Sequence, residues 1–289
     1  MKPAPLDYAA PATLDEAVAV LAEHGDDAKV LAGGQSLMPL LNLRLARPSV
    51  LVDLRAIPAL GDVDVGRSIR VGARVTQAQL LRNEAACAAQ PLLPQAIACI
   101  GHQAIRNRGT VVGSIAHADP AAELPAVAVA TDAAAIVASA TTTRRVPARA
   151  LFESHFTTVL EPDEVIVALD IPVLPPGAGA AWVELAQRHG DFALVGVAVI
   201  VGFDDLDFNR LDVSLSGVSA VPLLVDGLEA ARTASREAAP QVVSELVARS
   251  IEPADDLFAS ARYRRDLTRV LVHDAVTKAI DMARASDGH

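Results

Sequence analysis

The spacing of apolar positions in the first part of the chain predicts a small α/β unit. Apolar residues recur at helical spacing from Leu14 to Leu21, directly after Thr13-Leu14-Asp15-Glu16, which has the form of a capping box. Short apolar runs at 28–32 and 50–54 indicate buried strands, and the stretch between them at 37–45 has a helical pattern. Helix, strand, glycine turn, helix and strand in this order are typical of a parallel sheet.

Further along, the pattern alternates between strands and short helices. Strands are predicted at 68–73, 133–139 and 164–171, helices at 77–88, 93–100 and 124–130, and a polar loop at 106–114. After the most linker-like segment, 172–179, strands come first and helices second, which indicates an α+β arrangement. These strands are expected at 181–185, 195–203 and 211–218, and the helices at 224–233, 240–248 and 263–285.

The linker divides the chain into two predicted domains. Residues 1–174 form the first, built from an N-terminal α/β unit (1–55) and a middle α+β unit (56–174), and residues 175–289 form the second. The fold class expected for the whole chain is α+β.

Composition narrows the possible functions. The 25 Lys and Arg against 35 Asp and Glu leave a net charge of −10, and no basic patch offsets it, so we expect no nucleic-acid partner. The longest uncharged apolar run, 192–203, is too short to cross a bilayer, and the first residues lack the apolar stretch of a signal peptide. We therefore expect no transmembrane segment and a cytoplasmic location. With only 2 Cys, the chain cannot hold an iron–sulfur cluster alone.

Gly33-Gly34-Gln35-Ser36 is the first candidate binding loop. It lies where a strand is predicted to end and a helix to begin, so free amides from Gly34 to Leu37 would point at one spot. Glycine allows close approach of an anion, and the helix dipole favours negative charge, as in phosphate sites. An ordinary tight turn is the alternative.

A second loop, Gly109-Thr110-Val111-Val112-Gly113-Ser114, strengthens the phosphate interpretation. It follows Arg106 and Arg108 and so combines hydroxyls, flexible backbone and positive charge. Two such loops on one scaffold could clamp a pyrophosphate from both sides. For the arginines alone, a solvated loop is the alternative.

Other motifs are incomplete. Neither loop contains GxGxxG, and no GxxxxGK[ST] occurs, which disfavours an ordinary Rossmann site and P-loop chemistry. Residues 34–38 resemble the GxSxG nucleophile elbow but carry Met38 in place of the last glycine. His117 and Asp119 offer two metal ligands without a visible third. We therefore assign neither catalytic nor metal-ligating residues.

At these loops the sequence resembles the FAD-binding (medium) subunit of molybdenum hydroxylases, a family that includes carbon monoxide dehydrogenase medium subunits and the flavin domain of xanthine dehydrogenase. The matching stretches are VLAGGQSLMPLLNLRLA (30–46), IRNRGTVVGSIAHADPAAELPAV (105–127) and ELAQRHGDFALVGVAV (184–199). Their order and spacing agree over essentially the whole chain.

The resemblance implies that FAD binds between the N-terminal and middle units. A C-terminal domain with a three-stranded antiparallel sheet and helices would shield the flavin. The pyrophosphate loops would be 32–36 and 110–114, with Glu123 near the adenosine ribose, Ile166 near the isoalloxazine and Phe192 gating one flavin face. The cofactor-binding positions implied are Leu31, Ala32, Gly33, Gly34, Gln35, Ser36, Leu37, Ile105, Thr110, Gly113, Ser114, Glu123, Ile166 and Phe192.

Two positions depart from the family's pattern. Val112 stands where relatives have the first glycine of Thr-x-Gly-Gly, and the lysine that relatives often carry near Val183 and Glu184 is absent. If the first position requires positive φ, Val112 would be strained or the loop would shift. The missing lysine removes a positive charge that could stabilise reduced flavin.

The resemblance also implies partner subunits. A small subunit would carry two [2Fe–2S] clusters and a large molybdopterin subunit the molybdenum cofactor, in a dimer of heterotrimers. Electrons would pass from the clusters to FAD and then to an external acceptor. The alternatives are a free-standing FAD oxidoreductase and a non-catalytic assembly protein that has lost FAD.

Overall fold

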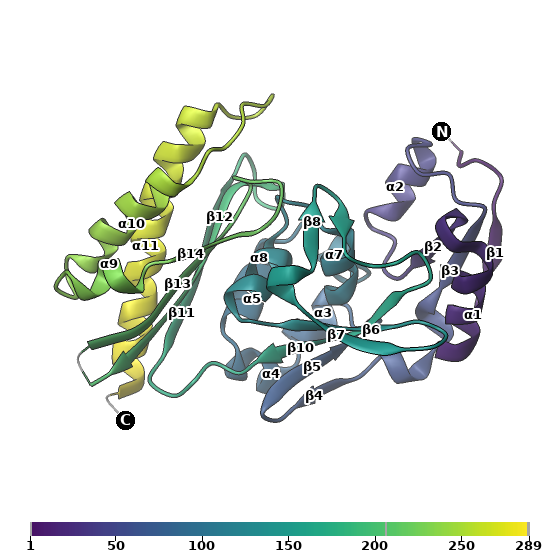
Figure 1. Ribbon diagram of the computed structural model, residues 1–289, viewed down its shortest axis with the longest axis horizontal. Coiled ribbons are helices and arrows are strands. Elements are labelled where there is room, and N and C mark those ends of the chain that lie inside the picture. The colour runs from purple at the N-terminus through teal and green to yellow at the C-terminus, as the bar shows by residue number, and fades with distance from the viewer. Residues whose placement is uncertain (1, 206, 288–289) are drawn as a thin grey trace.

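The computed structural model describes residues 2–205 and 207–287. Three units follow one another along the longest axis in chain order, with the N-terminal unit at one end and the C-terminal helices at the other (Figure 1). The expected α+β class is confirmed, because a small parallel sheet is followed by two larger antiparallel sheets.

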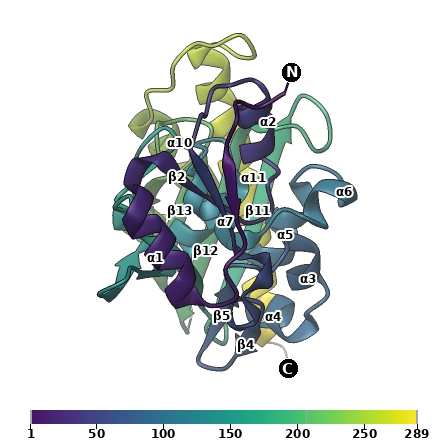
Figure 2. The same ribbon diagram turned by 90° about the vertical axis from the view of Figure 1, so that its right-hand side faces the viewer.

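The N-terminal unit has the predicted α/β order. Its strands β1 (Asp7–Ala9), β2 (Ala28–Leu31) and β3 (Val50–Asp53) form a parallel sheet in the order β1-β3-β2. Helix α1 (Leu14–His24) begins at Thr13, whose Oγ1 accepts a hydrogen bond from the Glu16 amide at 3.2 Å. Helix α2 (Leu37–Asn42) follows β2, and both helices lie at the front of the end view in Figure 2.

The middle unit is a five-stranded antiparallel sheet with six short helices. The sheet order is β4-β5-β10-β6-β7, and a two-stranded ribbon, β8-β9, lies outside it. The strands are β4 (Val63–Val65), β5 (Ser68–Gly72), β6 (Ala134–Ala138), β7 (Thr143–Pro147), β8 (Phe152–Ser154), β9 (Thr157–Thr158) and β10 (Val165–Pro172). The helices are α3 (Gln77–Leu81), α4 (Glu84–Ala89), α5 (Leu92–Cys99), α6 (Gln103–Arg106), α7 (Val111–His117) and α8 (Glu123–Ala130).

Two predictions in this unit were wrong in detail. The helix expected at 77–88 is divided into α3 and α4, because the Asn83 side chain accepts a hydrogen bond from the Ala86 amide at 3.0 Å and starts a new helix. The segment 106–114, expected as a loop, ends in the first turn of α7, which Thr110 caps.

The C-terminal unit contains the three predicted strands and a fourth. Strands β11 (Gly179–Ala186), β12 (Ala193–Asp204), β13 (Asp207–Ser216) and β14 (Leu223–Asp226) form an antiparallel sheet in that order. Because β14 pairs with β13, the helix expected at 224–233 is shortened to α9 (Leu228–Arg232). Helices α10 (Ala239–Ser250) and α11 (Ala261–Asp287) cover one face of this sheet (Figure 1).

The other face of the C-terminal sheet packs on the middle unit. Ala198 and Ile200 of β12 and the single tryptophan, Trp182 of β11, belong to the same apolar core as α5 and α8. The Trp182 amide donates to Gln95 Oε1 at 2.8 Å, and the Gly217 amide donates to the Pro120 carbonyl at 2.8 Å. Apolar burial and direct hydrogen bonds therefore both hold the C-terminal domain against the middle unit.

Ion pairs close one edge of this junction. Asp132, at the end of α8, lies 2.6 Å from Arg149 Nε and 3.4 Å from Arg210 Nη2 of β13. Arg210 also donates to the Ala130 carbonyl at 3.0 Å. In the described part of the chain, no helix combines the length and apolar character needed to span a membrane.

Candidate functional site

The two predicted loops lie directly against each other. A Cβ atom built on Gly33 would lie 2.3 Å from the Arg108 carbonyl oxygen and 2.8 Å from Gly109 Cα. One built on Gly113 would lie 3.8 Å from Ala32 Cβ. Loops 75 residues or more apart in the sequence therefore form one continuous surface, and glycine at 33 is required for their contact.

The first loop offers backbone donors. Gly34 adopts a φ of +70°, which turns the chain from β2 into α2. Ser36 is the N-cap residue of α2 and is exposed, and among the described residues its hydroxyl makes no capping hydrogen bond. Leu31, Ala32, Gln35 and Leu37 are partly buried around this turn. The Met38 amide donates to the Gly34 carbonyl at 3.1 Å and Pro39 has no amide hydrogen, so among the described residues it is the amides of the turn 34–37 that are left for an anionic ligand.

The second loop is closed by its own side chain. Thr110 is buried and its Oγ1 accepts a hydrogen bond from the Gly113 amide at 3.0 Å, which caps α7. Val112 lies in the first turn of this helix, 3 % exposed and part of the core. A right-handed helical residue carries no left-handed strain, so valine replaces glycine here without a backbone cost. Gly113 and Ser114 remain partly exposed toward the first loop.

The two arginines that precede the second loop contact the backbone in different ways. Arg106 donates from Nη1 to the carbonyls of Ile100 and Gly101 at 2.8 and 2.9 Å. Arg108 presents its carbonyl oxygen to Gly33. The Arg106 guanidinium is therefore held by two neutral carbonyls and keeps its positive charge, and the contribution of the two arginines to a phosphate site stays a prediction.

Two acidic side chains, Glu123 and Glu184, lie where the middle and C-terminal units meet. Glu123 is 5 % exposed at the start of α8, and Glu184 of β11 accepts a hydrogen bond from Trp182 Nε1 at 3.0 Å. Burial, with the charge of Glu184, raises the pKa of Glu123 to about 8. Burial also raises the pKa of Glu184, and it raises that of the Cys99 thiol to about 12. Glu123 is therefore mostly protonated at neutral pH.

The remaining implied positions lie in different environments. Ile105 is 38 % exposed on α6, against Gly101. Ile166 is 3 % exposed in the core, at the irregularity in the pairing of β10 with β6. Phe192 is 65 % exposed on the segment that leads into β12. The side chain of Ile166 therefore contributes to packing, whereas Phe192 and Ile105 can reach a ligand.

Gln77 is a buried residue against the second loop that the sequence did not reveal. It is 4 % exposed at the start of α3, and its amide donates to the Gly109 carbonyl at 2.8 Å. Its Oε1 lies 3.1 Å from the Cβ position of Gly109 and has no hydrogen-bond partner among the described residues. A glutamine at the start of a helix gives no sequence signal of burial, because glutamine is normally exposed there.

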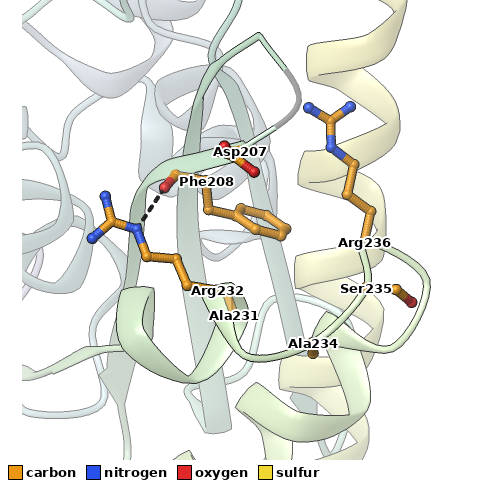
Figure 3. Close-up of a pocket in the computed structure, with 7 residues that line it drawn as sticks. All are labelled: Asp207, Phe208, Ala231, Arg232, Ala234, Ser235 and Arg236. Atoms are coloured by element: carbon orange, nitrogen blue, oxygen red, sulfur yellow. Dashed lines mark hydrogen bonds between the residues drawn. The ribbon is translucent and has the colours of Figure 1, made fainter.

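Two of the cavities in the described part of the chain lie outside the two loops. The larger, about 550 Å³, is in the C-terminal unit (Figure 3). Arg232 at its wall donates to the Phe208 carbonyl at 3.0 Å, and Arg236 donates to the Asp205 carbonyl at 2.8 Å. Both arginines of this cavity therefore donate hydrogen bonds to backbone carbonyls at the turn between β12 and β13. The second cavity, about 190 Å³, is lined by Cys99, Glu184, Ala186, Arg188, His189 and Gly190.

His117 is part of a ring contact. Its ring lies 5.1 Å from that of Phe156, and burial lowers its pKa. Over the residues described, no group of three or more His, Cys, Asp or Glu side chains is placed to hold a metal ion.

Family comparison identifies the class of site. Residues 4–174 match the FAD binding domain in molybdopterin dehydrogenase, and residues 180–279 match the CO dehydrogenase flavoprotein C-terminal domain. The turn 34–37 fits this class, because among the described residues its amides are left for an anionic group such as a pyrophosphate.

Relatives match over their full length. The chain is 38% identical to the 6-hydroxypseudooxynicotine dehydrogenase complex subunit alpha of Paenarthrobacter nicotinovorans, with 98% of this chain and 97% of that protein covered. It is 35% identical to the caffeine dehydrogenase subunit beta of Pseudomonas sp. strain CBB1, with 97% of each covered.

A solved structure agrees with these relatives. Carbon monoxide dehydrogenase from Hydrogenophaga pseudoflava, in a form lacking the Mo-pyranopterin moiety, superposes with a TM-score of 0.93 at 34% identity, covering 98% of this chain and 99% of that chain. The fold and the two loops define an oxidoreductase flavoprotein with an FAD-binding domain. The chain belongs to the FAD-binding medium subunits of the molybdenum hydroxylase family.

Proposed function

We propose that the chain binds FAD between the loops 32–36 and 110–114 and acts as the electron-transfer subunit of a molybdenum hydroxylase complex. When bound, FAD supplies a carrier that accepts electrons from the [2Fe–2S] clusters of a small subunit and passes them to an external acceptor. A large subunit would hold the molybdenum cofactor, in a cytoplasmic dimer of heterotrimers.

The contact between the two loops is the observation that carries this proposal. Ala32 and Gly33 lie against Gly113 and the backbone of 108–109, which places the amides of the turn 34–37 beside the start of α7. These amides can bind a pyrophosphate, and the positive end of the α7 dipole beside them favours its negative charge. Leu31, Leu37 and Ile105 would line the cofactor, Glu123 would lie near its ribose, and Phe192 would cover one flavin face.

Two acidic side chains lie near the place where relatives often carry a lysine. One of them, Glu184, accepts a hydrogen bond from Trp182 Nε1. Because the pKa of Glu123 is raised to about 8, Glu123 and Glu184 do not add two full negative charges beside the cofactor at neutral pH. Protonated Glu123 can also donate a hydrogen bond to a ribose hydroxyl.

A free-standing oxidoreductase is less well supported, because relatives that match this chain over nearly their whole length are named as subunits of dehydrogenases.

An absorption spectrum tests FAD binding. The purified chain, incubated with FAD and gel-filtered, should show flavin bands near about 370 and 450 nm. Gly33→Asp should abolish them, because it adds bulk and negative charge where the Arg108 carbonyl already lies. Gly66→Asp is the matched control, since a Cβ at Gly66 meets nothing within 4 Å. Flavin retained by Gly33→Asp would refute the loop assignment.

Co-purification tests the partners. The chain produced together with its partner subunits should elute with iron, molybdenum and FAD in constant proportion, and substrate should bleach the iron–sulfur and flavin absorption together. Turnover of a substrate by the chain alone would favour the free-standing alternative.

A further inference from the structure

Arg264 is a charged residue buried in the C-terminal domain, beside its junction with the middle unit. It lies in the first turn of α11 and is 6 % exposed. Its guanidinium donates from Nη1 to the Leu194 carbonyl and, at 2.8 Å, to the Gly217 carbonyl, and from Nη2 to Asp256 Oδ2 at 2.5 Å. A cation buried this deeply is stable only when its donors are matched, as they are here.

The two carbonyls lie at the ends of strands, where the regular pairing of the sheet is interrupted or stops. Leu194 lies at the irregularity in the pairing of β11 with β12, where Leu185 pairs with Val195 and Ala186 with Ala193. Gly217 follows the last paired residue of β13 and has a φ of +79°. Carbonyls that a ladder no longer satisfies need another donor, and one guanidinium supplies it to both.

The segment 190–194 is thereby fixed at two points. At one end, Gly190 adopts a φ of +87°, and a Cβ built on it would lie 2.8 Å from the Gly101 carbonyl oxygen of the middle unit. At the other end, Arg264 holds Leu194. Phe192 stands between these points with 65 % of its surface exposed, so its direction depends on the backbone anchors rather than on packing of its own ring.

Through Gly217, the same guanidinium is also linked to the turn that precedes Glu123. The Gly217 amide donates to the Pro120 carbonyl at 2.8 Å, and Pro120 lies in the turn that leads into α8 and Glu123. One residue of the C-terminal domain thus holds the backbone beside Phe192 and beside the turn before Glu123.

We propose that Arg264 is a positioning residue that holds the segment 190–194, and with it Phe192, over the bound flavin. This inference rests on the proposed FAD site. Asp256 orients the guanidinium, and it is itself fixed by the amides of Phe258 and Ala259, which donate to its Oδ1 at 2.8 Å. Removing the guanidinium frees Leu194, and Phe192 then no longer covers the flavin.

Iodide quenching of flavin fluorescence tests this proposal on the FAD-loaded full chain. Phe192→Ala and Arg264→Met should each raise the quenching constant by the same factor, and the double variant should show no further increase, because both remove one cover. Arg264→Lys should restore part of the protection, since an ammonium can serve both carbonyls. Arg262→Met, on the exposed side of the same helix turn, is the control.

The outcomes separate the two proposals. Additive effects of Phe192→Ala and Arg264→Met, or unchanged quenching in either single variant, would overturn the positioning role while leaving FAD binding intact. Wild-type chain without FAD would instead contradict the proposed function. If Arg264→Met does not fold, Asp256→Asn gives the test. It should increase the quenching constant, and combining it with Phe192→Ala should give no further increase.

Discussion

The two loops that meet at the candidate FAD site differ in what stabilises their backbone conformation. The loop 32–36 depends on a neighbour, because Gly33 fits only by lying against the backbone of 108–109 and Ser36 leaves its helix uncapped among the described residues. The loop 110–114 is stabilised by its own residues, through the hydrogen bond from the Gly113 amide to Thr110 and the burial of Val112. One loop is therefore shaped for a ligand and the other for stability, so substitutions in the two loops should have separable effects on FAD binding and on folding.

Adjacent glycines of the first loop should differ most. Gly33→Ala should abolish FAD binding, since its Cβ would lie 2.3 Å from a backbone oxygen that cannot move alone. Gly34→Ala meets only the side chains of Leu31 and Met38, at 3.2 and 3.3 Å, and should cost about 1–2 kcal/mol for its left-handed φ. The FAD-to-protein ratio after gel filtration measures the first effect and urea unfolding the second. Equal FAD loss in both variants would contradict the distinction.

The buried carboxyl group of Glu123 should make the stability of the fold depend on pH. Its pKa is raised from 4.5 to about 8, so the folded state holds the proton more tightly than the unfolded state. The resulting stabilisation is complete below pH 4.5 and is lost as the pH rises through about 8. Glu123→Gln should therefore gain stability relative to wild type over this range. Denaturant unfolding at several pH values measures it, with the exposed Glu153→Gln as control. A parallel pair of pH profiles would argue against a buried neutral Glu123.

Restoring the relatives' glycine in the second loop should weaken the fold without improving the site. Val112→Gly removes a buried side chain and places glycine in a helix, at a cost of about 2–3 kcal/mol. FAD content should remain that of wild type, because Val112 points into the core. Thermal or urea unfolding with parallel FAD analysis checks both parts. A large gain in FAD affinity would show that valine restricts the site.

Loss of the Thr110 cap should have the smallest effect. Thr110→Val keeps the shape but removes the acceptor for the Gly113 amide, which should cost about 1 kcal/mol. Thr110→Ser retains the oxygen and should remain near wild type. Comparing the urea midpoints of these two variants isolates the hydrogen bond from the side-chain volume.

Local signals explain what could be predicted from the sequence. The N-cap at Thr13, the glycines at 33 and 34 and the apolar runs on either side defined the N-terminal unit without long-range information, although Glu16 accepts from the Ala12 amide and so does not complete the expected capping box. The start of α7 was missed because Thr110, Val111 and Val112 are β-branched and have weak helix propensity. Burial of the helix and the threonine cap override that preference.

Long-range contacts explain the rest. Strand β14 depends on pairing with β13, and its run of three apolar residues, 223–225, cannot by itself be distinguished from the first turn of a helix. The burial of Glu123 and Arg264 depends on the C-terminal sheet closing against the middle unit. No pattern around either residue indicated it, because Glu and Arg are normally exposed.

The position of Trp182 makes the junction between the domains optically visible. It is the only tryptophan of the chain, is 7 % exposed, and bonds through its amide to Gln95 of the middle unit and through its indole to Glu184. Its emission spectrum therefore reports one place alone, the seam between the C-terminal sheet and the middle unit. A red shift of that emission at denaturant concentrations where FAD is still bound would record the C-terminal domain detaching before the cofactor loops open.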